Sequence, residues 1–228
     1  MKVERNAPAP HRRWHLAARL ALTLAAATLL IGCNIVAPAI GVASGRGKQE
    51  AMYTLKPKLS TLVFVDDRAS KLGRSSLRLS ISEVAGRALL QNELVEDVIN
   101  SQGAIAFART ELPDKPFTIE EIGESVGAAQ IIYVEIDGFG LTNDGVTLAP
   151  TASARARVVE VGATPARVWP EGADAFQVYA QVRDQGEVQL TNASRRALQD
   201  KLAAELGAAI AKLFYEHTNP YLLEREGR

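Results

Sequence analysis

The sequence predicts an α/β sandwich in which helices pack on a mixed sheet of about five strands. Three observations support this fold class: a continuous apolar run over 61–66, an alternation of apolar and polar residues over 152–158, and apolar residues at helical spacing over 192–214. The elements are expected in the order β-α-β-α-α-β-β-β-α, within a single domain that spans 59–217.

The first half of this domain is expected to begin with a β-α-β unit. Residues 61–66 form an apolar run that is typical of a strand buried on both faces. Apolar residues at helical spacing predict a helix over 76–93, and 94–99 is the expected second strand. Ser101 is the expected cap of a short helix over 103–110.

A capping box predicts the start of the next helix. Thr118 and Glu121 stand three residues apart, so that each side chain can satisfy a backbone amide at the helix start. Gly127 is expected to end the helix in a left-handed conformation, and 130–136 is the strand that follows.

The last part of the domain is expected to hold an antiparallel meander and a long helix. One strand face is predicted to carry Ala152, Ala154, Ala156 and Val158. The opposite face is predicted to carry Ser153, Arg155, Arg157 and Val159. Residues 166–169 are expected to begin a strand that 175–182 continues or repeats, and Asn192 is the expected cap of the final helix.

The amino-terminal segment resembles a bacterial lipoprotein export signal. Basic residues flank an apolar run over 16–30 that is shorter than the roughly 20 residues needed to span a bilayer. Leu30-Ile31-Gly32-Cys33 follows and matches the lipobox. The resemblance implies cleavage before Cys33 and acylation of that residue, palmitate included, which anchors the mature chain in a membrane.

Two alternatives to this lipobox assignment stay open, namely an ordinary secretory signal and an uncleaved membrane anchor. The export route is also open, although the general secretory path is favoured over a twin-arginine signal at Arg12-Arg13. Asn34 stands where an aspartate would retain a lipoprotein at the inner membrane. We therefore expect an outer-membrane lipoprotein that faces the periplasm.

The expected division of the chain is a signal peptide over 1–32, a flexible tether over 33–58, the domain over 59–217 and a charged tail over 218–228. The leader removes five of the 26 basic and one of the 26 acidic residues, which leaves 21 basic and 25 acidic residues in the mature chain. A nucleic-acid binder would show a basic excess, so no nucleic-acid partner is expected.

Catalytic side chains are scarce in the mature chain. Cys33 is the only cysteine, and His217 is the only histidine outside the leader. Catalytic triads and histidine- or thiolate-based metal sites need more such groups than the chain has. We therefore expect no enzyme activity, no catalytic residues, no metal and no cofactor.

The candidate partner-binding residues are Arg155, Arg157, Trp169 and Tyr179. The two arginines are expected on the solvent-facing side of their strand. The alternative for the arginines is that they keep an exposed strand soluble, and the alternative for the aromatic residues is packing in the core. The acidic residues at two strand ends are expected to have structural places: Asp66 and Asp67 in a turn, Glu135 and Asp137 in a solvated row.

The domain resembles a group of envelope proteins that includes the curli-transport lipoprotein, the lipoprotein activators of penicillin-binding proteins and the amino-terminal domain of the Tol translocation protein. The resemblance rests on Val63-Phe64-Val65-Asp66-Asp67 and on the stretch 122–134, with its Gly127-Ala128-Ala129-Gln130 before a hydrophobic strand. It implies assembly or scaffolding work, often through oligomers or by docking on a larger machine. The segment 146–182 is too short for the membrane hairpins of the pore-forming members.

The leading hypothesis is a non-enzymatic, lipid-anchored accessory protein that supports envelope assembly or transport by binding another envelope protein or itself. The alternative is a lipid or glycan carrier with a pocket between sheet and helix.

Overall fold

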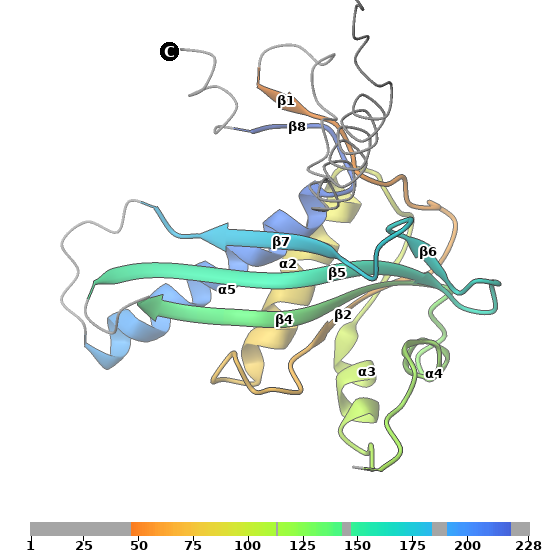
Figure 1. Cartoon of the computed structure of the whole chain (residues 1–228), viewed down its shortest axis with the longest axis horizontal. Coiled ribbons are helices and arrows are strands. Elements are labelled where there is room, and N and C mark those ends of the chain that lie inside the picture. The colour runs from red at the N-terminus through yellow and green to blue at the C-terminus, as the bar shows by residue number, and fades with distance from the viewer. Residues whose placement is uncertain (1–46, 113, 143–146, 184–190, 220–228) are drawn as a thin grey trace, which may run out of the picture. The chain divides into compact units, whose positions relative to one another are not determined.

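The computed structural model of the chain describes residues 47–112, 114–142, 147–183 and 191–219 (Figure 1). All of them belong to one compact unit, Ser44–Arg228. Cys33, the leader, most of the predicted tether and most of the charged tail lie outside the described residues. None of the described helices has the length and apolar character needed to cross a bilayer.

The described elements follow the predicted order, with additions at both ends. The strands are β1 (Lys48–Gln49), β2 (Thr61–Asp66), β3 (Val98–Ile99), β4 (Gln130–Thr142), β5 (Leu148–Glu160), β6 (Arg167–Trp169), β7 (Phe176–Gln181) and β8 (His217–Thr218). The helices are α2 (Ser76–Gln91), α3 (Ser101–Ala108), α4 (Ile119–Glu124) and α5 (Asn192–Lys212). The predicted class, helices packed on a mixed sheet of five or six strands, is confirmed.

The main sheet has the strand order β3-β2-β4-β5-β6, and β7 also pairs with β5. β2 runs parallel to β3 and β4, whereas β4 and β5 are antiparallel. β6 pairs with β5 at Val158 and Val159, and β7 pairs with the stretch Thr151–Ala156. The second half of the meander is therefore one interrupted edge strand along β5, in line with the expectation that 175–182 continues 166–169.

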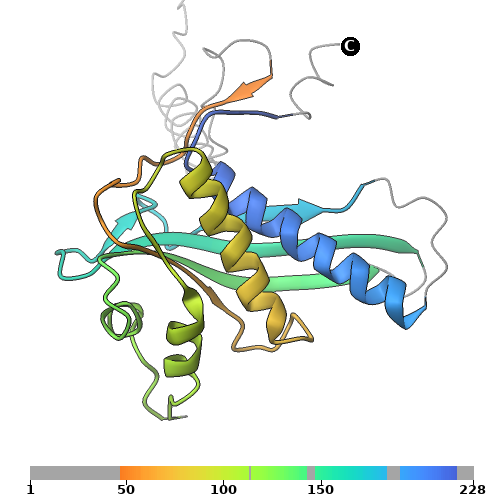
Figure 2. The same cartoon turned by 180° about the vertical axis from the view of Figure 1, so that it is seen from behind.

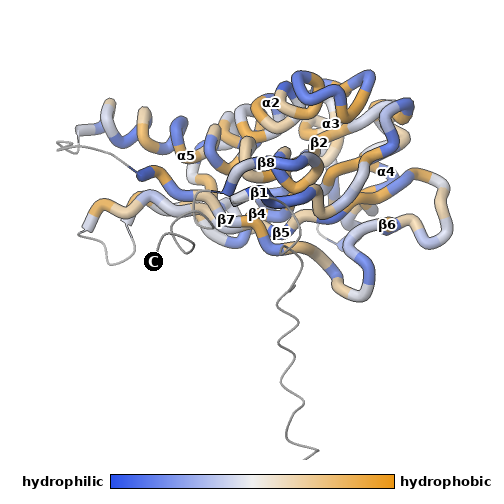
Figure 3. Tube along the Cα trace, turned by 90° about the horizontal axis from the view of Figure 1, so that it is seen from above, coloured by the Kyte–Doolittle hydropathy of each residue, from blue (hydrophilic) through white to orange (hydrophobic). Residues whose placement is uncertain are grey.

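Helices cover the two faces of the sheet unequally. α2 and α5 pack over one face, as Figures 1 and 2 show from opposite sides, and close the larger core. α3 and α4 close a smaller core on the other face, around Phe64, Tyr133 and Val159. Hydrophobic and hydrophilic positions alternate along α5 (Figure 3), and burial alternates along β5, as expected of elements that bury one side. The distal part of β4, β5 and β7 thus has one face that no described helix covers.

The predicted helix ends agree with the structure at one site and differ at two. The box of Thr118 and Glu121 is present with both of its hydrogen bonds, and Gly127 has a φ of 74°. Asn100, not Ser101, caps α3, because its side chain accepts from the amide of Gln102. Thr191, not Asn192, caps α5, because its hydroxyl accepts from the amide of Ser194. In both cases the cap is the residue just before the predicted one.

The packed part of the chain starts before the predicted boundary at residue 59. Leu55 is only 3% exposed and belongs to the larger core. Lys56 holds this segment to the sheet, since its amide donates to Gln130 and its ammonium lies 2.6 Å from Glu160. That hydrogen bond to Glu160 raises the pKa of Lys56. The last residues predicted for the tether therefore cover one end of the core.

A second, two-stranded sheet joins the two ends of the domain. β1 and β8 pair antiparallel, with Lys48 opposite Thr218 and Gln49 opposite His217. Lys48 and Glu216 add an ion pair of 2.6 Å. His217 is therefore a strand residue, and its ring nitrogen lies 3.1 Å from the carbonyl oxygen of Tyr215.

Candidate functional site

The uncovered sheet face carries most of the residues that the sequence singled out. Burial along β5 alternates, with Ala152, Ala154 and Ala156 against the helices. Arg155 and Arg157 therefore point to the opposite face. Gln177 lies across from Arg155, and Tyr179 lies across from Ser153, so both β7 residues share that face. We call this surface the open face.

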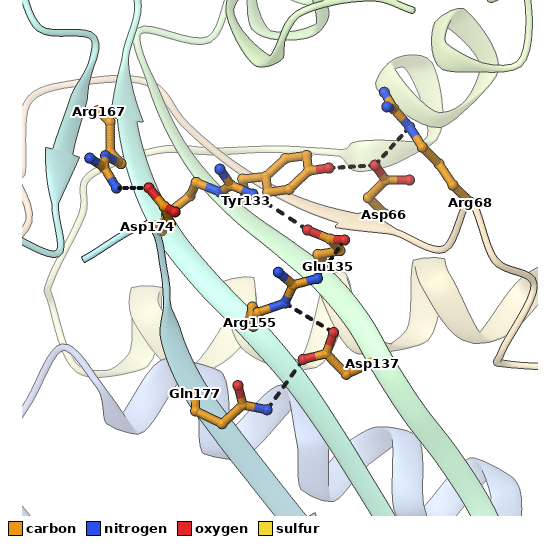
Figure 4. A network of polar contacts seen from close by, with 10 residues as sticks. Asp66, Arg68, Tyr133, Glu135, Asp137, Arg155, Arg167, Asp174 and Gln177 are labelled. Atoms are coloured by element: carbon orange, nitrogen blue, oxygen red, sulfur yellow. Dashed lines mark hydrogen bonds and ion pairs between the residues drawn. The ribbon is translucent and has the colours of Figure 1, made fainter. Parts of the chain in front are cut away.

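Arg155 is paired with both acidic residues of β4 (Figure 4), and Arg157 is paired with one of them. Arg155 lies 2.7 Å from Glu135 and 3.0 Å from Asp137, whereas Arg157 lies 3.4 Å from Glu135. The hydrogen bond to Asp137 and the charge of Glu135 raise the pKa of Arg155. The open face thus presents a nearly neutral row of ion pairs, in which Glu135 and Asp137, the row predicted to be solvated, are partly exposed and hold the two arginines.

The row continues into the sheet interior through Tyr133. The guanidinium of Arg157 lies over the Tyr133 ring at 5.0 Å from its centroid, and the Tyr133 hydroxyl donates to Asp66. Asp66 also lies 3.1 Å from Arg68 (Figure 4). Burial, followed by the bond to Asp66, raises the pKa of Tyr133 well above its ordinary value. Asp67 lies in the predicted turn, where its carboxylate accepts from the amides of Lys71 and Leu72.

The two aromatic candidates lie on opposite sides of the sheet. Tyr179 is 71% exposed on the open face. Trp169 is only 6% exposed on the helix side, where its ring packs near Phe176 at 5.3 Å and Phe214 at 6.0 Å. The structure therefore brings Arg155, Arg157 and Tyr179 to one surface and places Trp169 in the core.

The outer edge of β7 is the feature that the sequence analysis missed. Among the described strands, β7 pairs with β5 alone. A strand with one partner directs every second amide and carbonyl outward, which makes it a template for another strand. No local pattern in 176–181 indicates this position, because the edge is defined by pairing with a distant strand.

A groove of about 450 Å³ runs along this edge, with α5 as its other wall. We call it the β7 groove. Its lining includes Tyr179, Gln181, Arg183, Lys201, Glu205 and Lys212. Three of these side chains are cationic and one is anionic, and within the described residues neither Lys201 nor Lys212 has an ion-pair partner. The described lining of the groove therefore has a net positive charge along a strand edge that can accept backbone hydrogen bonds.

The described part of the chain offers little for metal or redox chemistry. It holds no group of three or more His, Cys, Asp or Glu residues arranged to bind a metal ion. The open face and the β7 groove can bind an extended chain through backbone hydrogen bonds and through charge.

No family model matches the chain, and no curated protein matches it. Among solved structures the chain is similar to a PelC dodecamer from Paraburkholderia phytofirmans, with 11% identity, a TM-score of 0.40, and coverage of 73% of this chain and 93% of that chain. It is similar to hypothetical protein CT253 from Chlamydia trachomatis, with 17% identity, a TM-score of 0.39, and coverage of 75% and 96%. It is also similar to lipoprotein GNA1162 from Neisseria meningitidis, with 16% identity, a TM-score of 0.33, and coverage of 57% and 88%.

Similarity at these identities and TM-scores says nothing about what this chain binds or how it assembles. None of the three names belongs to the curli-transport, penicillin-binding-protein-activator or Tol group, so that resemblance stays a prediction.

Proposed function

We propose that the protein is a lipid-anchored accessory protein of the outer membrane, facing the periplasm, that supports envelope assembly or transport by binding another envelope protein. The observation that carries the proposal is the outer edge of β7, with which no other described strand pairs, beside a basic groove. Anchoring rests on the lipobox at Cys33.

The partner contributes an extended, acidic segment that adds to β7 as a further strand. Backbone hydrogen bonds along β7 would supply affinity without demanding a sequence, as in other cases of strand addition. Lys201 and Lys212 favour carboxylates on the incoming segment, because both line the groove without an ion-pair partner in the described structure. Tyr179 adds an exposed aromatic surface at the same edge.

Arg155 and Arg157 have a supporting place in this proposal. Both are already paired with Glu135, so an anionic partner would have to displace an existing ion pair to reach them. They hold the open face in a fixed arrangement next to Tyr179, whereas Lys201 and Lys212 provide the attraction.

The scarcity of catalytic side chains supports a non-enzymatic role. Turnover of an envelope substrate by the full chain, abolished by replacing a carboxylate such as Asp66 or Glu135, would contradict this part of the proposal.

Proximity crosslinking in native cells, with the acylated full chain as bait, tests the docking proposal. The wild type should capture one reproducible envelope protein, and the double variant Lys201→Glu with Lys212→Glu should capture much less of it. The matched control is Lys58→Glu with Lys71→Glu, which changes the net charge equally at two exposed lysines outside the groove. Equal capture by both double variants would overturn docking at the groove, and capture of this chain alone would show self-assembly instead.

A pocket of about 300 Å³ favours the second candidate function, a carrier of a lipid or glycan. It lies between α2 and the β3 edge of the sheet, with apolar walls from Val63, Leu90, Val98 and Ile99. Ser101 lines it as well, and the buried hydroxyl of Ser101 has no hydrogen-bond partner in the described structure. Native mass spectrometry of the acylated chain would show a bound molecule besides the anchor if the carrier function holds, and an empty chain if it does not.

A further inference from the structure

The carboxyl end of β2 opens into a small pocket that the docking proposal does not use. Its volume is about 170 Å³, and charged side chains dominate its lining: Asp66, Asp67, Arg68, Arg78, Arg109 and Glu111. The strand order of the sheet reverses at β2, since β3 lies on one side of it and β4 on the other. Crevices at such strand ends are where open α/β sheets bind ligands.

Arg78 is held rigidly at this pocket. Its Nε donates to the carbonyl of Val65 at 2.8 Å, and its guanidinium lies 5.5 Å from the centroid of the Phe64 ring. It belongs to the first turn of α2, where the helix dipole disfavours a positive charge. Burial lowers its pKa, against the opposing effect of Asp66 and Asp67. Helix stability therefore does not account for an arginine at this position.

Arg109 brings a second guanidinium to the same pocket. It stands at the C-cap of α3, and no hydrogen bond or ion pair joins its side chain to any described residue. The charge of Arg109 acts on Arg78, which places the two cations close together. Two neighbouring guanidinium groups repel each other unless an anion lies between them.

The carboxylates around the pocket already have partners. Asp67 accepts from the amides of Lys71 and Leu72, and Asp66 accepts from Tyr133 and lies 3.1 Å from Arg68. Glu111 lies 3.0 Å from the same arginine. The terminal nitrogens of Arg78 and the whole guanidinium of Arg109 are left without a carboxylate in the described structure.

We propose that Arg78 and Arg109 bind the oxyanion of one phosphoryl group in this pocket. The planar guanidinium presents paired N–H donors that match phosphate oxygens bidentately. The pocket has room for a small anion only, so the remainder of a larger ligand would extend into solvent. A lipid headgroup and free phosphate offer the same chemistry.

Calorimetric titration of the acylated full chain, in a phosphate-free detergent at constant ionic strength, tests the proposal with inorganic phosphate as the probe. Saturable binding is expected. Arg78→Lys and Arg109→Lys keep the positive charge but remove the paired N–H donors of the guanidinium group. Each should therefore weaken phosphate binding about tenfold or more. Arg195→Lys, at an exposed position of α5 outside this pocket, is the matched control and should bind as the wild type does.

Flotation with vesicles distinguishes the two sources of phosphate, and it uses a chain whose leader and Cys33 are replaced by an ordinary cleavable signal peptide, so that neither an acyl anchor nor an uncleaved leader binds by itself. Binding to phosphatidylglycerol vesicles that Arg109→Lys abolishes would assign a lipid headgroup, and phosphate binding without such flotation would assign the free anion. Absence of saturable binding in both assays, or binding that Arg109→Lys leaves unchanged, would overturn the site. If the Arg78→Lys variant fails to fold, Arg109→Lys alone tests the site. The Arg109 side chain has no hydrogen bond or ion pair to lose in the described structure.

Discussion

Tyr133 links the open face to the interior at the scale of single residues. Its ring stacks near Phe64 at 6.1 Å on one side, and Arg157 covers it on the other. Its hydroxyl satisfies Asp66, which is only 5% exposed. A buried carboxylate without such a donor costs free energy, so Tyr133 fixes the geometry between the exposed ion pairs and the end of β2.

Tyr133→Phe should lower the free energy of unfolding by about 1–3 kcal/mol, because it leaves the buried Asp66 with Arg68 as its remaining partner. Urea unfolding measures the change. Tyr179→Phe removes a hydroxyl from an exposed ring and is the control, with an unchanged midpoint expected. A midpoint for Tyr133→Phe equal to that of this control would contradict the proposed place of the hydroxyl.

The same residue predicts how stability depends on pH in the alkaline range. The pKa of Tyr133 is raised above 10.0 in the folded chain, so the folded state holds the proton more tightly than the unfolded state. The stabilisation is complete below about pH 10 and is lost as pH rises through the folded value. Wild type should therefore lose stability more steeply above pH 10 than Tyr133→Phe, as measured by urea unfolding at a series of pH values. Parallel slopes would contradict the raised pKa.

At the scale of elements, the close crossing of α2 and α5 determines how tightly the helix layer packs. Gly207 makes this approach possible: a Cβ at this position would lie 2.7 Å from the carbonyl oxygen of Ile81 and 2.9 Å from the Cβ of Val84. The contact is with backbone and with a β-branched side chain, neither of which can move cheaply.

Gly207→Ala should destabilise the chain by about 1–3 kcal/mol through overpacking, although alanine is the better helix former. Thermal unfolding checks the sign. Gly103→Ala is the matched control on α3, since its Cβ would meet only Val126 Cγ1 at 3.3 Å. We expect that variant to be neutral or slightly stabilising, and a stabilised Gly207→Ala would show that the helices do not cross as described.

Local patterns predicted most elements but not their long-range pairing. The box of Thr118 and Glu121 and the alternation of β5 depend on neighbours in the sequence, and both are present as expected. The pairing of β6 and β7 with one strand, and of β1 with β8, joins distant segments, so no local pattern could indicate it. Trp169 illustrates the limit: a three-residue strand is too short for its alternation to reveal which face is buried.

The candidate site was predictable only in part, because it also depends on pairing between distant segments. The face of Arg155 and Arg157 follows from the alternation of β5, whereas their ion pairs with Glu135 depend on the register between β4 and β5. The β7 groove needs both the edge position of β7 and the docking of α5, which only the three-dimensional fold provides.

At the scale of the whole molecule, the anchoring proposed at Cys33 would determine where the β7 groove acts. Cys33→Ala should abolish incorporation of radiolabelled palmitate and leave an uncleaved precursor, because the lipobox resemblance implies both acylation of Cys33 and cleavage directly before it. Metabolic labelling followed by gel electrophoresis measures both. A palmitate label that persists in Cys33→Ala would contradict lipidation at this residue, and wild type without label would favour an ordinary secretory signal.

A photocrosslinking amino acid at the position of Tyr179 tests, in native cells, the docking of an extended partner along β7. Tyr179 is exposed at the proposed edge, and Gln102, exposed on α3, gives a control position away from the groove. We expect an adduct with one envelope protein from position 179, none from position 102, and loss of the adduct in the Lys201→Glu, Lys212→Glu background. Equal adducts from both positions, or an adduct that the two charge reversals leave unchanged, would contradict it.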